Sequence, residues 1–113
     1  MIIVNATMKP IADKKEEIIE KAETLIAASR THHGNISYNL YSDIETGNLM
    51  FVEKWESKEA LQKHMQTDEF VDFGQETKDL VDGDLGIDIY YAELLSNSAD
   101  VKNDVKEIRI YYQ

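Results

Sequence analysis

The chain has no cysteine among its 113 residues. Disulfide bonds, thiolate nucleophiles, iron–sulfur clusters and cysteine-ligated zinc are therefore excluded. The five glycines never form a Gly-x-Gly-x-x-Gly run and no Walker pattern occurs, so the motifs that hold flavin, nicotinamide or nucleotide phosphates are missing as well. From these absences we expect no bound cofactor.

Basic residues and long apolar runs are also scarce. Only 12 lysines and arginines stand against 22 acidic residues, a formal net charge of −10, which opposes binding to nucleic acid or to anionic membrane. No apolar run approaches the roughly 20 residues that cross a bilayer, and residues 1–5 lack the basic and apolar parts of a signal peptide. We expect a cytoplasmic protein that binds neither nucleic acid nor membrane.

The hydrophobic pattern predicts a single domain of the α+β class. Alternating apolar residues predict strands at residues 2–8, 35–41, 49–55 and 87–94, and helical spacing predicts helices at 11–29, after Ser57 to residue 65, and over 70–81. This order is the ferredoxin-like split βαββαβ arrangement, an antiparallel sheet with its helices on one face. Residues 1–95 form this domain.

The predicted strands carry apolar side chains on both faces, although the helices cover only one. Met50 and Val52 oppose Leu49, Phe51 and Trp55 across one predicted strand, and Tyr90 opposes Ile89 and Tyr91 across another. An apolar patch of this kind is too large for a soluble monomer. We therefore expect a homodimer in which a second copy covers the sheet.

Residues 96–113 form a C-terminal extension that begins with a polar break. Its apolar residues fit either one face of a helix or a strand at residues 107–112. The alternation and the β-branched and aromatic content favour the strand. We expect this strand to pack on the sheet edge or on a partner subunit.

The most informative run spans residues 49–65. Glu53 and Trp55 lie on one face of the predicted strand, and Ser57 is placed to cap the first amides of the next helix. Leu61 and His64 then share a face of that helix. His64 is therefore expected to point inward.

This run resembles the core of the antibiotic biosynthesis monooxygenase (ABM) family, in which a strand ending in Glu-x-Trp is followed by a serine, an acidic-Ala turn and a helix with a histidine. The matching positions are Glu53, Trp55, Ser57, Glu59, Ala60 and His64. The similarity extends from residue 1 to about residue 95. It implies a homodimer whose two sheets close into one dimeric α+β barrel, and one of several activities on a small molecule.

His64 and Asn5 are the candidate catalytic residues. An imidazole with a pKa near 6.5 suits proton abstraction at neutral pH, and histidine at this position lines the substrate cleft in many relatives. Asn5 interrupts an apolar strand, and relatives with asparagine there use it to hold substrate or oxygen. Two structural alternatives stay open: a buried histidine bonded to a backbone carbonyl, and an amide bonded to a neighbouring strand or helix end.

Four aromatic residues are candidates for substrate binding. Trp55 offers a flat surface for stacking on a quinone-like ring, and Phe70, Phe73 and Tyr38 are possible walls of the same pocket. The alternative for all four is ordinary core packing, because apolar faces at helical spacing usually belong to the core.

Metal and haem chemistry are not expected. His32 and His33 are adjacent, so on a helix their side chains diverge by about 100° and chelate one metal poorly. The haem-degrading branch of the fold needs an axial histidine near the position of Gly74, and neither Gly74 nor its neighbours can supply one.

The resemblance thus implies a cofactor-independent monooxygenase that oxidises a quinol or similar phenolic small molecule with dioxygen. His64 would be the base or its orienting partner, Asn5 a donor to the oxyanion or to oxygen, and Trp55 a wall. Two alternatives remain open: an isomerase that shuttles a proton on a small metabolite, and a ligand-binding module without catalysis.

Overall fold

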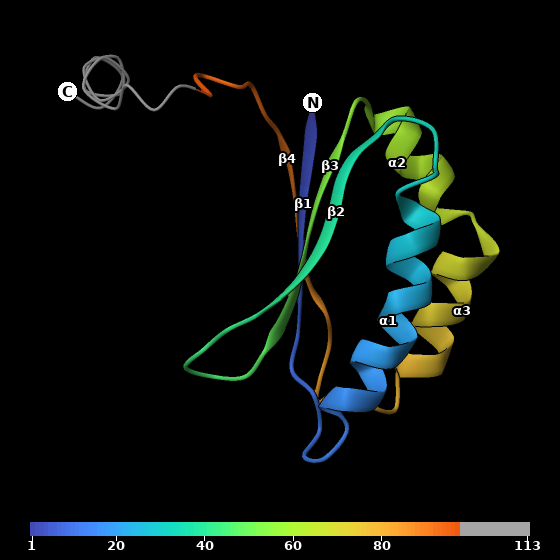
Figure 1. The fold of residues 1–113 in the computed structure, drawn as a ribbon, viewed down its shortest axis with the longest axis vertical. Coiled ribbons are helices and arrows are strands. Elements are labelled where there is room, and N and C mark those ends of the chain that lie inside the picture. The colour runs from blue at the N-terminus through green and yellow to red at the C-terminus, as the bar shows by residue number, and fades with distance from the viewer. Residues whose placement is uncertain (98–113) are drawn as a thin grey trace.

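A computed structural model describes residues 1–97 of the chain, so the strand expected at 107–112 lies outside the described residues. The described elements are β1 (Ile2–Met8), α1 (Lys15–Ser29), β2 (Asn35–Ser42), β3 (Leu49–Trp55), α2 (Lys58–Met65), α3 (Asp68–Thr77) and β4 (Gly86–Tyr91). The four strands form one sheet in the order β2-β3-β1-β4, and every neighbouring pair is antiparallel. All three helices lie on one face of the sheet (Figure 1). The predicted ferredoxin-like α+β fold is confirmed.

The core lies between this sheet face and the helices. In β3 every second residue is buried, so Leu49, Phe51, Glu53 and Trp55 point toward the helices. Helix α1 contributes its own buried stripe at three- and four-residue spacing, which includes Ile18. The predicted alternation of side chains along β3 is therefore present, and it gives the sheet an inner face and an open face.

The predicted cap of α2 is confirmed. The Oγ of Ser57 accepts a hydrogen bond of 3.1 Å from the backbone N–H of Ala60. Helix α3 begins in the same manner, because Thr67 Oγ1 accepts from the backbone N–H of Phe70 at 3.4 Å. The two caps fix a sharp break between α2 and α3, and this break sets His64 and Phe70 side by side.

Three predicted boundaries shift. The helix expected from residue 11 begins only at Lys15, because Asp13 adopts a left-handed backbone with φ of 70° that no helix can include. Helix α3 ends at Thr77, and Val81 instead bridges to Pro10. Strand β4 is shorter than predicted and ends at Tyr91, just before Ala92 donates its N–H to the carbonyl of Met1.

The turn between α1 and β2 is held against the start of α2 by Gly34. Its φ is 81°, and an added Cβ would lie only 2.5 Å from the Cβ of Ala60. The carbonyl of Gly34 also accepts a hydrogen bond of 2.8 Å from the N–H of Glu56. Glycine is required here both for the left-handed backbone and for the close approach. The contact places His32, two residues before Gly34, beside α2.

The open face of the sheet carries a mixture of apolar and polar side chains. Ile3, Met50 and Val52 are half-buried there, whereas Tyr41 and Tyr90 are exposed. In the described part of the chain, no helix is long and apolar enough to span a membrane.

Candidate active site

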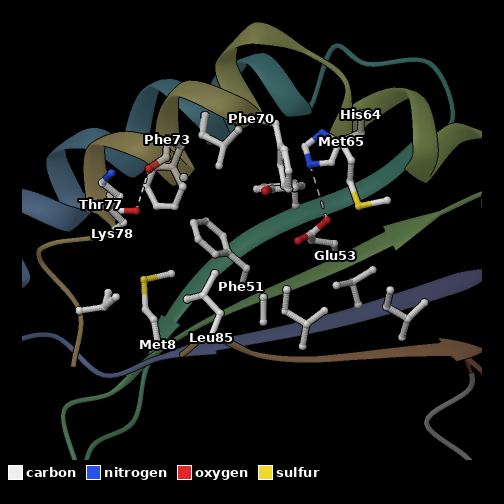
Figure 2. A pocket seen from close by; sticks show the side chains of 18 of the residues that line it. Met8, Phe51, Glu53, His64, Met65, Phe70, Phe73, Thr77, Lys78 and Leu85 are labelled. Atoms are coloured by element: carbon white, nitrogen blue, oxygen red, sulfur yellow. Dashed lines mark hydrogen bonds and ion pairs between the residues drawn. The ribbon is translucent and has the colours of Figure 1, made fainter. Parts of the chain in front are cut away.

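A cavity of about 310 Å³ lies between the inner face of the sheet and helices α2 and α3 (Figure 2). Its apolar walls come from β1, β3, β4 and the two helices. Prominent members are Val4, Ala6, Met8, Phe51, Leu61, Met65, Phe70, Phe73, Leu85, Ile87 and Ile89. The volume is at the lower end of the range for small-molecule sites. Such a cavity suits a compact, largely apolar ligand.

Polar groups gather at opposite ends of this cavity. Glu53 and His64 lie at one end, and Thr77 and Lys78 at the other (Figure 2). Both members of the first pair are buried, and His64 Nε2 lies 3.9 Å from Glu53 Oε1. That distance is too long for a hydrogen bond. His64 Nε2 is thus a buried ring nitrogen that has no hydrogen-bond partner among residues 1–97.

Aromatic rings hold His64 in place. Its ring centroid lies 4.6 Å from that of Trp55, 5.0 Å from Phe70 and 5.3 Å from Tyr38. These contacts fix the orientation of the imidazole and exclude water from around it. Its Nε2 therefore remains directed toward Glu53.

A second histidine lies behind the first. His32 Nδ1 is 3.0 Å from His64 Nδ1, and His32 Nε2 is 2.9 Å from Glu69 Oε1. A carboxylate only accepts, so His32 Nε2 must carry hydrogen. When His32 is neutral, its Nδ1 is then an acceptor and His64 must donate through Nδ1–H. In that tautomer His64 Nε2 has a free lone pair.

Burial shifts the pKa of both groups at this end of the cavity. Desolvation lowers the pKa of His64 to about 4, with a further lowering from His32 and an opposing effect of Glu69. Desolvation raises the pKa of Glu53 to about 7, partly offset by the hydrogen bond from Trp55. At neutral pH His64 is therefore an uncharged base, and Glu53 divides between carboxyl and carboxylate.

The structure brings together most of the residues predicted for the site. His64, Tyr38, Phe70 and Phe73 all line the cavity. Trp55 lies beneath it, fully buried, where its indole N–H donates to Glu53 Oε1 at 3.0 Å. Its place is behind the polar end and not on the wall.

Asn5 is not brought to this cavity. Val4 and Ala6 line it, and because successive side chains of a strand alternate, Asn5 faces the open side of the sheet. Its strand partners are Val52 of β3 and Asp88 of β4. The two candidate catalytic residues therefore lie on opposite faces.

Sequence reasoning did not select Glu53, His32 or Glu69 as site residues. Glu53 was detectable, because an acidic residue among inward-facing apolar positions requires a partner. His32 was considered only as part of a helix, whereas the helix ends at Ser29 and His32 occupies the following turn. Among residues 1–97, no three histidine or acidic side chains are grouped to hold a metal ion.

A split βαββαβ domain with a cavity between its sheet and its helices defines a protein of the ferredoxin-like class. The sequence profile of the antibiotic biosynthesis monooxygenase family matches residues 1–76. The match covers most of the chain, from β1 almost to the end of α3, and includes His32, Glu53, His64 and Glu69. The chain belongs to the antibiotic biosynthesis monooxygenase family.

The chain is also similar to individual proteins. The chain is 39% identical over 90 residues to the uncharacterized protein sll1783 of Synechocystis, which covers 79% of this chain and 61% of that protein. It is 31% identical over 88 residues to the Putative monooxygenase YcnE of Bacillus subtilis, covering 77% of this chain and 93% of the relative. A crystal structure of a conserved protein from Methanosarcina mazei Go1 superposes with a TM-score of 0.78 at 25% identity, covering 81% and 92%.

Proposed function

We propose that this protein is a cofactor-independent monooxygenase that oxidises a quinol or a similar electron-rich phenol with dioxygen. The observation that carries the proposal is the Nε2 of His64, a neutral base at an apolar cavity, which has no hydrogen-bond partner in the described part of the chain. Family membership supports oxidation by dioxygen as the class of reaction.

The reaction begins with removal of a proton from a substrate hydroxyl by His64 Nε2. The resulting anion is electron-rich enough to reduce dioxygen and form a bond from oxygen to a ring carbon. One oxygen atom remains on the ring as a hydroxyl, the other leaves as water, and the ring becomes a quinone. The substrate thus supplies all four electrons, so the reaction balances without an added reductant.

Glu53 takes the role of hydrogen-bond donor to the oxyanion, which was predicted for Asn5. As a carboxyl group it can donate a hydrogen bond to an oxyanion, and it lies on the same side of the cavity as His64. The raised pKa of Glu53 keeps part of the protein in this donating form near neutral pH. The Trp55 N–H donates to Oε1 of this carboxyl group and holds the group in place.

The aromatic walls favour a flat substrate. Phe51, Phe70 and Phe73 present their rings to the cavity, and the rings of Phe51 and Phe73 pack edge to face at 5.5 Å. Stacking and edge contacts of this kind suit an aromatic ring. A one- or two-ring quinol fits this chemistry.

We further propose that the protein is a homodimer joined through the open face of the sheet. Half-buried Ile3, Met50 and Val52 occupy the middle strands of that face, flanked by exposed Tyr41 and Tyr90. A second copy would cover this surface, as expected for the dimeric α+β barrel.

A test of the function is oxygen uptake with a reduced naphthoquinone, without flavin or metal. His64→Ala should slow turnover by roughly 10²-fold or more, because a general base contributes that much. Asn5→Ala is the matched control, since Asn5 lies on the other face of the sheet, and it should stay within about twofold of the parent rate. Equal rates for the His64 variant and the parent would refute the assignment of the base.

An isomerase is the second candidate, and the pairing of His64 with Glu53 favours it. A neutral base and a carboxyl group 3.9 Å apart can take a proton from one atom of a substrate and return it to another. Such a reaction consumes no oxygen. Turnover of the same substrate under anaerobic conditions would select it over the monooxygenase.

A further inference from the structure

His32 and Glu69 form a polar chain that the proposed reaction does not yet use. Neither side chain lines the cavity, yet together they connect its base to the protein surface. Glu69 lies in α3, His64 in α2, and His32 in the turn that follows α1. Three separate parts of the chain therefore converge on one line of hydrogen bonds.

The hydrogen bonds of His32 and Glu69 remove a difficulty in the use of His64 as a base. A fully buried imidazole that simply gained a proton would become a buried cation, and the aromatic rings around it offer little solvation. Within residues 1–97, the one carboxylate within 4 Å of its Nε2 is that of Glu53, at 3.9 Å. His64 needs a route by which charge can leave as the proton arrives.

We propose that His32 and Glu69 are a proton relay for His64, an inference that rests on the proposed function of His64 as the base. As the substrate O–H bond breaks and the Nε2–H bond of His64 forms, the Nδ1–H bond of His64 breaks and the Nδ1–H bond of His32 forms. His64 changes tautomer and remains neutral. His32 becomes an imidazolium paired with the Glu69 carboxylate.

Solvent exposure increases along the three side chains in the direction of this transfer. The side chain of His64 is 0% exposed, that of His32 14% and that of Glu69 36%. The positive charge thus forms where solvent and a carboxylate can stabilise it. The hydrogen bond from His32 lowers the pKa of Glu69, so Glu69 is ionised at neutral pH. In this proposal the proton leaves through His32 and Glu69 and not through the apolar cavity.

The adjacent histidines at 32 and 33 provide a matched test. His32→Gln can still accept a hydrogen bond from His64 Nδ1–H but cannot take up the proton. It should lower kcat by roughly tenfold or more with KM within about twofold, because substrate does not touch His32. His33→Gln should match the parent, since His33 is exposed and forms no hydrogen bond or ion pair in the described region. Glu69→Gln, which keeps an acceptor but removes the charge, should fall between the two.

Tautomer states read by ¹⁵N NMR test the relay without turnover. Over a pH series, we expect His64 in the parent to carry its proton at Nδ1 whenever His32 is neutral, and to switch to the Nε2–H form whenever both nitrogens of His32 carry protons. The titratable groups facing the pair are Glu69, Glu53 and Tyr38, and the same titration of Glu53→Gln separates the carboxyl group of Glu53 from the switch. In His32→Gln the switch should disappear.

The outcomes separate the relay from the proposed function. A parent-like kcat for His32→Gln, together with a slow His64→Ala, would overturn the relay and leave the base in place. If no quinol is oxidised, the proposed function fails, and the tautomer switch alone decides the relay. A His64 that keeps Nε2–H throughout would refute the relay in either case.

Discussion

The indole N–H of Trp55 donates a hydrogen bond of 3.0 Å to Glu53 Oε1, and both side chains are buried on the same face of β3. Residues two apart in a strand share a face, so a Glu-x-Trp sequence places the donor beside the acceptor by its spacing alone. Trp55 is therefore a positioning residue for a buried acid. Substitution of either residue therefore tests the effect of this hydrogen bond on the buried acid.

Glu53→Gln should change stability in a pH-dependent way. The pKa of Glu53 is raised from 4.5 to about 7, so the folded protein binds more protons than the unfolded chain between these values. Stability from this group is complete below pH 4.5 and is lost as the pH rises through 7. The parent thus loses of the order of 3 kcal/mol that the glutamine variant does not lose.

Melting temperatures at pH 5 and pH 8 measure this effect. Glu53→Gln should gain stability relative to the parent at the higher pH. His64 contributes with the opposite sign, because its lowered pKa makes stability fall as the pH drops from 6.5 toward 4. Comparing the two proteins at one pH cancels that contribution to first order. An identical difference at both pH values would contradict the buried, protonated carboxyl group.

Trp55→Phe should raise the pKa of Glu53 above its parent value. The substitution keeps most of the buried ring but removes the N–H that stabilises the carboxylate, while the desolvation that raises the pKa remains. The carboxyl stretching band in infrared titration reports this pKa directly. A pKa unchanged or lowered in the variant would mean that the indole N–H does not stabilise the ionised form.

Gly34→Ala should destabilise the protein far more than Gly83→Ala. Both glycines have a φ of 81°, so each variant places a side chain in left-handed backbone at a cost of about 1–2 kcal/mol. Only at Gly34 does the new Cβ meet another atom, the Cβ of Ala60 at 2.5 Å, whereas Gly83 has open space. We expect a fall of roughly 4–8 °C per kcal/mol, with at least twice the fall for Gly34→Ala. Similar falls for both would show that the turn can move away from α2.

Light scattering tests the proposed dimer. At micromolar concentration the protein should have twice the mass of one chain, with more than about 1,200 Å² buried in total. Val52→Lys places a charge at the middle of the open face and should yield monomers. Ile44→Lys is the control, because Ile44 is 100% exposed in the loop between β2 and β3. A monomeric parent would refute the dimer.

Much of the fold was predictable because its signals are local. The alternation in β3 and the Ser57 cap depend on residues next to one another in sequence, and both hold in the structure. The face of Asn5 was less accessible. Side chains alternate along β1, so Asn5 and Val4 lie on opposite faces of the sheet. The alternation alone does not say which of the two faces the helices cover.

His32 illustrates what local patterns do not reveal. It belongs to a turn, where no periodicity assigns a direction to the side chain, and its partners are 32 and 37 residues away in sequence. The close packing of Gly34 on Ala60 brings them together. The sequence shows that Gly34 follows His32 by two residues, but it does not show that Gly34 packs against the Cβ of Ala60.

The position of the cavity against an edge strand has a consequence for ligand binding. Among the strands of residues 1–97, β4 pairs only with β1, and its inward-facing Ile87 and Ile89 are 53% and 54% exposed although they line the cavity. An apolar ligand in the cavity would act as the missing core side chain for this edge. Binding would then stabilise β4 against local unfolding. Amide hydrogen exchange in that strand would slow when the cavity is occupied, even by a ligand that is never turned over.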